Sequence, residues 1–203
     1  MATTTKAAPK KAATKSTSKT ATKAAKAPKV PENTEIAEES ALNELFIDEL
    51  KDIYWAEKHL TKALAKLSKK ATTDELRGAI QTHITQTENQ ITRLEQVFDV
   101  VGEKATAKKC EAMAGLIKES EEIVESTEDG SITRDAGIIS ACQKVEHYEI
   151  ASYGTLKTLA GVLGYAEAVE LLDATLQEEK QTDEILTQVA EGTINQSAKT
   201  EKA

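Results

Sequence analysis

The sequence predicts an all-α fold in which four long helices form a bundle. Apolar residues recur at spacings of three and four over four long stretches, which is the periodicity of helices that each bury one face. The composition agrees, because 39% of the 203 residues are hydrophobic and 30% are charged, while only 3% are aromatic and three are proline. Such a balance is typical of helices built from alanine, leucine, glutamate and lysine.

The first two predicted helices form a hairpin. One runs from about residue 40 to 70, and after a short turn Thr73 can cap a second helix that Gly102 ends. The apolar stripe of the first helix contains Leu42, Leu45, Phe46, Glu49, Ile53, Ala56, Leu60, Leu64 and Leu67. The stripe of the second contains Leu76, Ile80, His83, Thr87, Ile91, Leu94, Phe98 and Val101.

The second half of the chain predicts another hairpin. A short amphipathic helix, at about residues 107–125, precedes a third long helix at about 134–163, which Gly164 ends, and a fourth at about 167–191. The third stripe contains Ile138, Cys142, Val145, Glu149, Tyr153, Leu156 and Ala160, and the fourth contains Leu172, Leu176, Glu179, Asp183, Leu186 and Val189. Two hairpins joined by one long crossover with a short extra helix are the connectivity of a ferritin-like four-helix bundle.

The domain organisation follows from a change in composition near residue 35. Residues 1–34 are a low-complexity mixture of alanine, lysine, threonine, serine and proline, which cannot offset its ordering entropy by burial, so we expect a disordered arm. Residues 35–192 form the predicted bundle, and residues 193–203 are expected to be a flexible tail.

Charge separates the arm from the body. Residues 1–30 contain eight lysines and no acidic residue, so the remainder carries 18 basic and 34 acidic residues, a net charge of −16. Any contact with nucleic acid should therefore be a nonspecific one made through residues 1–30, although a solubilising or anchoring tail explains the arm equally well.

The remaining composition predicts a cytoplasmic protein. No stretch approaches the ~18 apolar residues that span a bilayer, and the N-terminus lacks the apolar middle region of a secretory signal. Cys110 and Cys142 show neither CxxC spacing nor a neighbouring histidine cluster, so we expect buried, reduced thiols.

Acidic residues interrupt the apolar faces of the predicted helices. Glu146 and Glu149 share one face of the third long helix, and Glu179 and Asp183 lie on the stripe of the fourth. Counting outward from the turns near residues 72 and 165, at a rise of about 1.5 Å per residue, places them level with Glu57 on the first helix. The second helix offers Glu88 at this depth, and His83 lies one turn before Thr87 on its stripe.

Carboxylates gathered at one level of a bundle repel one another unless cations or protons neutralise them. The pattern therefore favours a pair of divalent ions, iron or manganese with zinc as a further option, held by Glu57, Glu146, Glu149 and Glu179. Asp183, Glu88 or His83 would complete the ligand set. The alternative is that these carboxylates reach solvent or pair with Lys and Arg, and that His83 is a hydrogen-bonded core residue.

Five segments resemble the bacterial YciE/YciF family: ELFIDELKDIYWAEKHLTKAL, HITQTENQITRLEQVF, KCEAMAGLIKE, KVEHYEIASYGTL and LLDATLQEEKQTDEIL. The resemblance covers residues 42–190. It implies a ferritin-like fold related to rubrerythrins and bacterioferritins, an association with stress, a di-metal site and a homodimer. Rubrerythrin-like sites use Glu-x-x-His on the second and fourth helices, and this sequence contains that motif nowhere.

The resemblance assigns metal-ligand positions residue by residue. Glu57 matches the ligand of the first helix, and Glu146 and Glu149 match the Glu-x-x-Glu motif of the third. We therefore expect a di-metal stress-response protein, with peroxide as the oxidant if it has redox chemistry. The rivals are a non-catalytic structural protein and a DNA-associated stress factor that acts through its basic arm.

Overall fold

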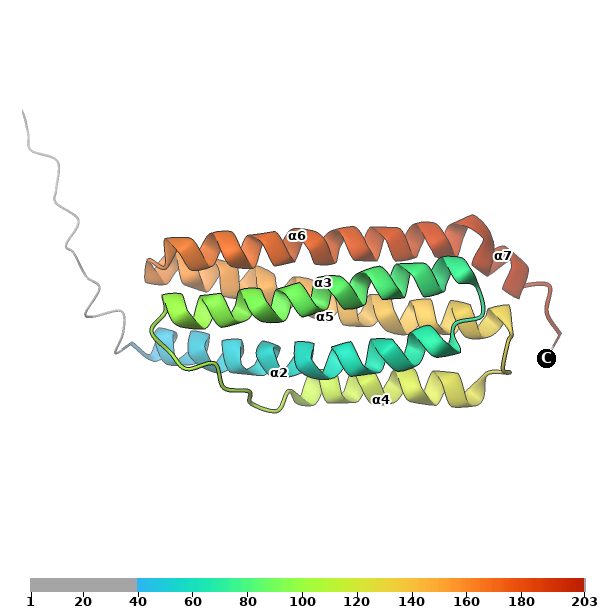
Figure 1. Cartoon of the computed structure of the whole chain (residues 1–203), viewed down its shortest axis with the longest axis horizontal. Coiled ribbons are helices and arrows are strands. Elements are labelled where there is room, and N and C mark those ends of the chain that lie inside the picture. Colours follow the sequence, from blue (N-terminus) through green and yellow to red (C-terminus); the bar gives the residue numbers. More distant parts are fainter. Residues whose placement is uncertain (1–39, 203) are drawn as a thin grey trace, which may run out of the picture. The chain divides into compact units, whose positions relative to one another are not determined.

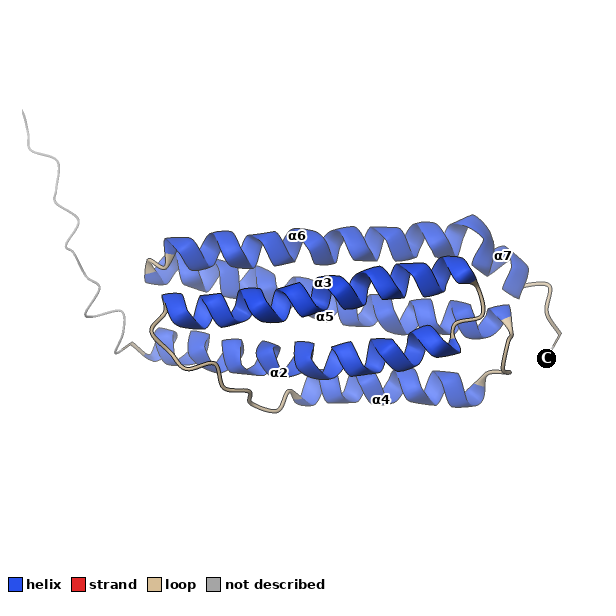
Figure 2. Ribbon diagram, viewed as in Figure 1, coloured by secondary structure: helices blue, strands red, loops and turns tan. Residues whose placement is uncertain are grey.

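A computed structural model describes residues 40–202, and within this range every regular element is helical (Figures 1 and 2). The elements are α2 (Ala41–Lys70), α3 (Asp74–Val100), α4 (Glu111–Ser126), α5 (Ile132–Leu163), α6 (Ala166–Val189), the π-helical η1 (Ala190–Ile194) and α7 (Asn195–Ala198). The predicted arm, residues 1–34, lies outside the described residues, and so does its predicted contact with nucleic acid.

Local signals set the helix ends. The hydroxyls of Ser40, Thr73 and Ser131 accept hydrogen bonds from backbone N–H groups in the first turns of α2, α3 and α5. At the end of α5, Gly164 adopts a left-handed conformation with φ 87°, which glycine tolerates without a Cβ clash. The predicted cap at Thr73 and stop at Gly164 are therefore confirmed.

The helices form two hairpins. Helix α2 packs against α3 and α5 against α6, and the hairpins join through the pairs α3–α6 and α2–α5. The connection from α3 to α5 travels along the bundle before α5 begins, and it carries α4 on the outside (Figure 1). This architecture confirms the predicted four-helix bundle with one long crossover.

Helix α4 covers the groove between α2 and α5. It contacts both helices, and a Cβ on Gly137 of α5 would lie only 2.6 Å from a methyl group of Ile123 in α4. The absence of a side chain at Gly137 thus allows this close approach. Residues 101–110 precede α4 as an irregular stretch, with Lys108 N–H bonded to the Lys51 carbonyl, so α4 begins later than the predicted residue 107.

Two positions of the predicted α2 stripe face outward. Leu45 is 50% exposed and Glu49 is also exposed, because the buried face is centred on Phe46, Leu50 and Ile53. The core continues through all of the long helices, and it is apolar at both ends of the bundle.

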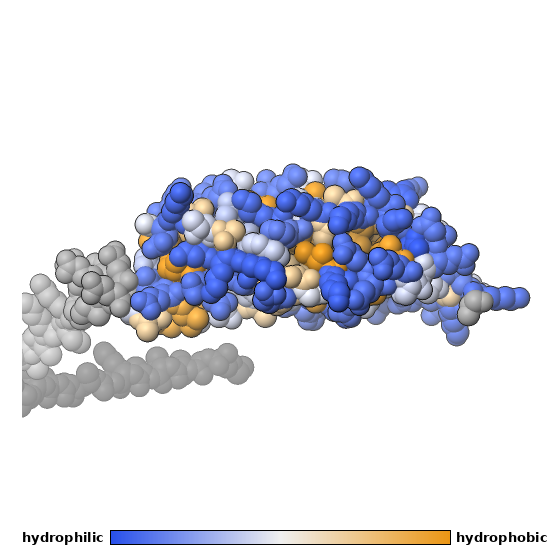
Figure 3. All heavy atoms as spheres, turned by 90° about the horizontal axis from the view of Figure 1, so that it is seen from below, coloured by the Kyte–Doolittle hydropathy of each residue, from blue (hydrophilic) through white to orange (hydrophobic). Residues whose placement is uncertain are grey.

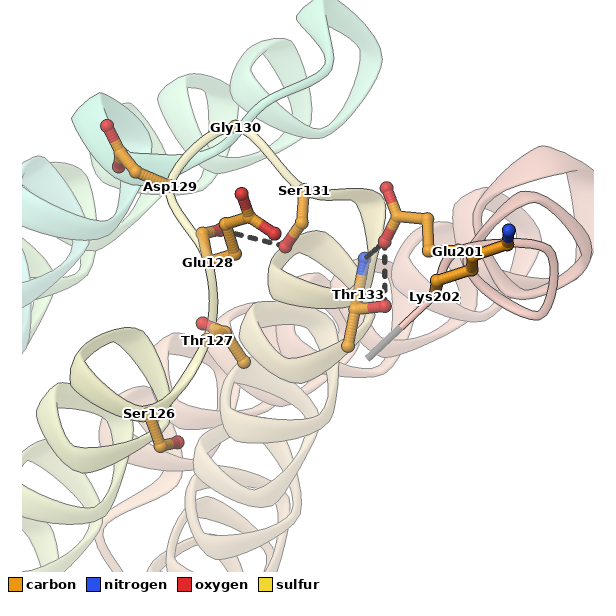
Figure 4. Close-up of a pocket in the computed structure, with 9 residues that line it drawn as sticks. All are labelled: Ser126, Thr127, Glu128, Asp129, Gly130, Ser131, Thr133, Glu201 and Lys202. Carbon is orange, nitrogen blue, oxygen red and sulfur yellow. Dashed lines mark hydrogen bonds between the residues drawn. The ribbon is translucent and has the colours of Figure 1, made fainter.

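The C-terminal segment differs from the expected flexible tail. The helix continues through η1 and α7, which contact α5, and Ile194 is 1% exposed. The Glu201 carboxylate then accepts hydrogen bonds from the backbone N–H groups of Ile132 and Thr133 and from the Thr133 hydroxyl, beside a surface pocket at this end of the bundle (Figure 4). Burial of Ile194 and this cap at the start of α5 explain why the segment follows the bundle.

The face of the body seen in Figure 3 is mainly hydrophilic. On the face shown in Figure 3, hydrophobic residues form small groups among hydrophilic ones. Among the described residues, no helix is long and apolar enough to cross a membrane.

Candidate metal centre

A polar layer interrupts the apolar core at mid-height, and every long helix contributes to it. Its members are Glu57 of α2, His83 of α3, Glu146 and Glu149 of α5, and Glu179 of α6, named here the buried cluster. The four carboxylates are 0% exposed, and His83 is 3% exposed. Each lies on the buried face of its helix one turn from apolar neighbours, as Glu57 does between Ile53 and Leu60.

The side chains of the buried cluster converge on one point. One ligand atom from each of His83, Glu146, Glu149 and Glu179 lies within 4.8 Å of the others. The fifth member, Glu57, accepts a very short hydrogen bond from the hydroxyl of Tyr153. The charge of Glu57 acts on Glu149 and Glu179, so each long helix contributes a side chain to this region.

Most polar atoms of the buried cluster lack a partner. Among the described residues, no hydrogen bond reaches either oxygen of Glu146, Glu149 or Glu179, nor Oε2 of Glu57 or Nε2 of His83. Nδ1 of His83 lies 3.2 Å from Glu146, at ion-pair distance but without forming a hydrogen bond. Buried polar groups are nearly always satisfied, so these atoms require a ligand or protons.

Burial governs the protonation of the cluster. Desolvation raises the pKa of Glu57 to about 6, and the hydrogen bond from Tyr153 partly offsets this effect, as do the neighbouring Glu149 and His83. Burial, and then repulsion by the neighbouring carboxylates, raises the pKa of Glu149 well above its ordinary value. For His83, desolvation lowers the pKa despite the charges of Glu179 and Glu57, so its imidazole is neutral at pH 7.

The structure brings together five of the seven residues that the sequence singled out. Glu57, His83, Glu146, Glu149 and Glu179 meet in the buried cluster. The two others do not reach its centre, and each has a separate geometric reason.

Glu88 is exposed on α3 and does not join the buried cluster. The inward positions of this helix are His83, Thr87 and Gln90, and the residue after Thr87 is rotated about 100° away from that face. Contrary to the expectation for Glu88, this side chain lies outside the buried cluster, and His83 is the side chain of α3 that joins it.

Asp183 lies at the rim of the buried cluster. Its side chain is 24% exposed and accepts a hydrogen bond from Gln143, with His147 Nε2 3.5 Å away. The inward face of α6 passes through Glu179 and Thr182, which leaves Asp183 turned toward α5.

Other polar side chains of this region were missed by the sequence analysis. Arg93 makes two 2.9 Å hydrogen bonds to Glu178 and a 2.7 Å bond to Thr175, and these link α3 to α6. The sequence places Tyr153 on the third stripe, and its position one turn after Glu149 is the signal for its contact with the cluster.

Both cysteines are buried free thiols, as predicted. Cys110 caps α4 instead of lying inside a helix. Its Sγ atom lies 3.1 Å from the hydroxyl of Tyr148, which donates to Asp52. Neither cysteine belongs to the buried cluster.

Comparison with known proteins agrees with this architecture. A family model described as "Domain of unknown function (DUF892)" matches residues 41–199. The protein YciF of Escherichia coli (strain K12) is 49% identical over 158 residues, which cover 77% of this chain and 95% of that protein. The chain belongs to the YciF family.

Solved structures of the YciF family share the fold. The crystal structure of YciF, described as an E. coli stress protein, matches with a TM-score of 0.73 at 49% identity and covers 77% of this chain and 98% of that chain. YcfI of Rhodopseudomonas palustris, described as a candidate structural protein, matches with a TM-score of 0.71 at 40% identity, covering 73% and 94% of the two chains. The resemblance read from the sequence motifs is therefore confirmed at the level of family and fold.

Proposed function

We propose that this member of the YciF family is a di-metal-binding protein of the stress response. Its buried cluster would hold two divalent cations, iron or manganese. The observation that carries the proposal is the set of fully buried carboxylate oxygens without hydrogen-bond partners among the described residues. The relative called a stress protein supports the physiological setting.

Charge supports a pair of ions. Four ionised carboxylates beside a neutral imidazole carry four negative charges, and two divalent cations balance them. Without cations or protons, such a group in a low-dielectric interior would strongly destabilise the bundle. The requirement for neutralisation thus agrees with the number of ions expected at a ferritin-like centre.

The donor atoms suit iron and manganese. Carboxylate oxygens with one imidazole form a hard site, and the lowered pKa of His83 keeps its ring in the neutral form that binds metals. Glu146, Glu149 and Glu179 would supply most of the ligands, with His83 and Glu57 completing the set.

The chain's own residues prepare this centre. The hydroxyl of Tyr153 holds Glu57 in one orientation, and the apolar residues above and below the cluster exclude water. When bound, two redox-active ions would supply Lewis acidity and electrons for reducing an oxidant such as peroxide.

A structural role is the second candidate. The Rhodopseudomonas relative described as a candidate structural protein favours it, and protons can replace cations in this cluster. The raised pKa values of Glu146, Glu149 and Glu179 would allow some of these groups to stay protonated and donate to their neighbours. The two functions differ in whether the isolated protein binds metal.

The test is metal binding by the wild-type protein and Glu149→Gln. After chelation and dialysis against Mn²⁺, each wild-type chain should retain about two ions, and Glu149→Gln should retain less than half of that metal. The substitution preserves side-chain volume and removes one charge, so the fold should persist. A wild-type protein that retains no Mn²⁺ and no Fe²⁺ would support the structural role.

Glu88→Gln is the matched control. It removes the same charge from another long helix, α3, but Glu88 is exposed and outside the buried cluster. Its metal content should equal that of the wild type. Equal losses in Glu88→Gln and Glu149→Gln would indicate a general effect of charge on loosely bound ions.

A further inference from the structure

The buried cluster has no exposed carboxylate, so an ion must pass between two helices to reach it. Glu146, Glu149 and Glu179 are each 0% exposed. The helix pairs that enclose the cluster are α2–α3, α3–α6, α2–α5 and α5–α6. The charges on these four faces differ, and they indicate which face a cation can cross.

Two of the faces carry cationic side chains. A shallow pocket between α2 and α3 is lined by Lys58, Lys62 and Ile91. Between α3 and α6, the guanidinium of Arg93 closes the gap through two hydrogen bonds to Glu178, and the two side chains form an ion pair without net charge. The lysines repel a cation that approaches the α2–α3 face, and the ion pair obstructs the α3–α6 face.

The third face is covered. Helix α4 lies over the groove between α2 and α5, and the hydroxyl of Tyr148 bridges Cys110 and Asp52 beneath it. The carboxylate of Asp52 accepts the hydrogen bond from Tyr148, so it is already paired inside the groove.

The fourth face presents an anionic side chain next to the buried cluster. Asp183 lies one turn after Glu179 on α6, is partly exposed, and interacts electrostatically with Glu146. On α5, the His147 ring is 71% exposed, with its Nε2 atom 3.5 Å from Asp183, and Gln143 donates to the same carboxylate. Nearby Lys144 is paired with Glu119 of α4, which offsets its charge.

We propose that Asp183 and His147 form an access port through which divalent cations pass between α5 and α6 to the buried cluster. The inference rests on the proposed metal-binding function. Asp183 holds the partly dehydrated ion at the rim. A nitrogen atom of His147 then replaces one of the waters bound to the ion as the ion moves toward Glu146 and Glu179. The port residues interact with an ion in transit, while the buried cluster holds it at equilibrium.

A port changes the rates of metal uptake and release without changing the affinity of the buried cluster for the metal. Because the same path serves uptake and release, Asp183 stabilises the ion at the barrier that both directions share, and removing its charge should slow both by a similar factor, on the order of tenfold. Asp183→Asn keeps the shape and the acceptor oxygen for Gln143. His147→Gln removes the imidazole and should also slow exchange.

The experiment follows Co²⁺ by its visible absorption after rapid mixing with the apo full-length chain, and its release after mixing with a chelator. Asp183→Asn and His147→Gln should reach wild-type occupancy through slower uptake and release, and Asp183→Glu should restore the rates. Glu88→Gln is the control for the α2–α3 face. Glu88 is exposed and lies two turns before Glu95 on the same side of α3, and Glu95 accepts a hydrogen bond from Tyr54 of α2.

Each outcome separates the port from the metal site. Unchanged rates in Asp183→Asn and His147→Gln would overturn the port while leaving the metal site intact, and slowing in Glu88→Gln alone would move the path to the α2–α3 face. Faster release with lower occupancy in Asp183→Asn would identify this residue as a ligand and contradict the port. A wild type that binds no Co²⁺ would overturn the proposed function and the port with it.

Discussion

At the residue scale, Tyr153 partly offsets the effect of burial on the protonation of Glu57. Its fully buried hydroxyl donates to Oε1 of Glu57, and this bond holds the pKa of Glu57 below the value that burial alone would produce. In Tyr153→Phe the pKa of Glu57 should therefore rise above about 6. Metal would compete with a more tightly held proton, so Mn²⁺ affinity at pH 6 should fall about fivefold, equivalent to about 1 kcal/mol for a buried hydrogen bond.

Calorimetric titration with Mn²⁺ at pH 6 and pH 8 measures this effect. At pH 8 the variant and the wild type should differ little, because Glu57 is ionised in both. Tyr54→Phe is the matched control, since Tyr54 donates a 2.7 Å hydrogen bond to Glu95 away from the buried cluster. An equal loss of affinity at both pH values would show that Tyr153 acts by packing instead of through the proton.

The sequence predicted the carboxylates of the buried cluster because helical periodicity relates residues on one helix. Glu146, Glu149 and Glu179 lie on buried faces that their apolar neighbours define. On α3, periodicity placed His83 on the apolar stripe while depth along the bundle favoured Glu88, and in the structure the rotation of the helix turns His83 inward. The bond from Tyr153 to Glu57 joins residues that are 96 positions apart, and only the folded structure reveals it.

At the element scale, Asp135 connects the two hairpins. This buried side chain of α5 accepts hydrogen bonds from the backbone N–H groups of Thr72 and Thr73, at 2.6 and 2.8 Å, and from the Thr73 hydroxyl at 2.7 Å. The α2–α3 turn is therefore fixed at the start of α5. This contact helps to align the carboxylates of the two hairpins at one depth.

Asp135→Ala should destabilise the protein by about 3 kcal/mol, because hydrogen bonds to a charged acceptor are lost and buried donors remain unsatisfied. Asp135→Asn keeps one acceptor oxygen and should lose less. Urea unfolding followed by circular dichroism measures both free energies. A loss below 1 kcal/mol in Asp135→Ala would show that water replaces the carboxylate and that other contacts set the register.

The helices themselves were predictable because their apolar stripes and end signals are local. The helix ends that depend on tertiary contacts could not be predicted from the sequence. Residues 193–203 were expected to be flexible, yet burial of Ile194 and the bonds from Glu201 to the start of α5 join segments that are distant in the sequence. The late start of α4 likewise follows from the path of residues 101–110 beside α2.

At the scale of the whole molecule, the buried cluster makes apo stability depend on pH. The folded pKa of Glu57 is about 6 against an ordinary 4.5, so between these values the folded state binds more protons than the unfolded state. Stability from this group therefore falls as pH rises through that window, by about 2 kcal/mol. Because the pKa values of Glu146, Glu149 and Glu179 are also raised, the stability of the metal-free protein should keep falling at higher pH.

The metal-free protein should thus unfold at lower urea concentration at pH 7.5 than at pH 5. His83 acts in the opposite direction, because its lowered pKa makes the folded state bind fewer protons below its ordinary value of 6.5, but the raised carboxyl groups outnumber it. Urea titrations in the presence of a chelator measure the slope of the free energy of unfolding against pH, and Mn²⁺ should reverse the sign of this slope. Glu149→Gln should flatten it, and an unchanged slope in that variant would assign the pH dependence to other groups.

The most direct test of the central claim is anomalous X-ray scattering from crystals of the full-length protein grown with Mn²⁺, with data recorded on both sides of the manganese absorption edge. We expect two anomalous peaks inside the bundle, each close to oxygens of Glu146, Glu149 and Glu179, with His83 and Glu57 completing the ligand set. A core without anomalous density, with the same carboxyl groups hydrogen-bonded to one another through shared protons, would contradict it.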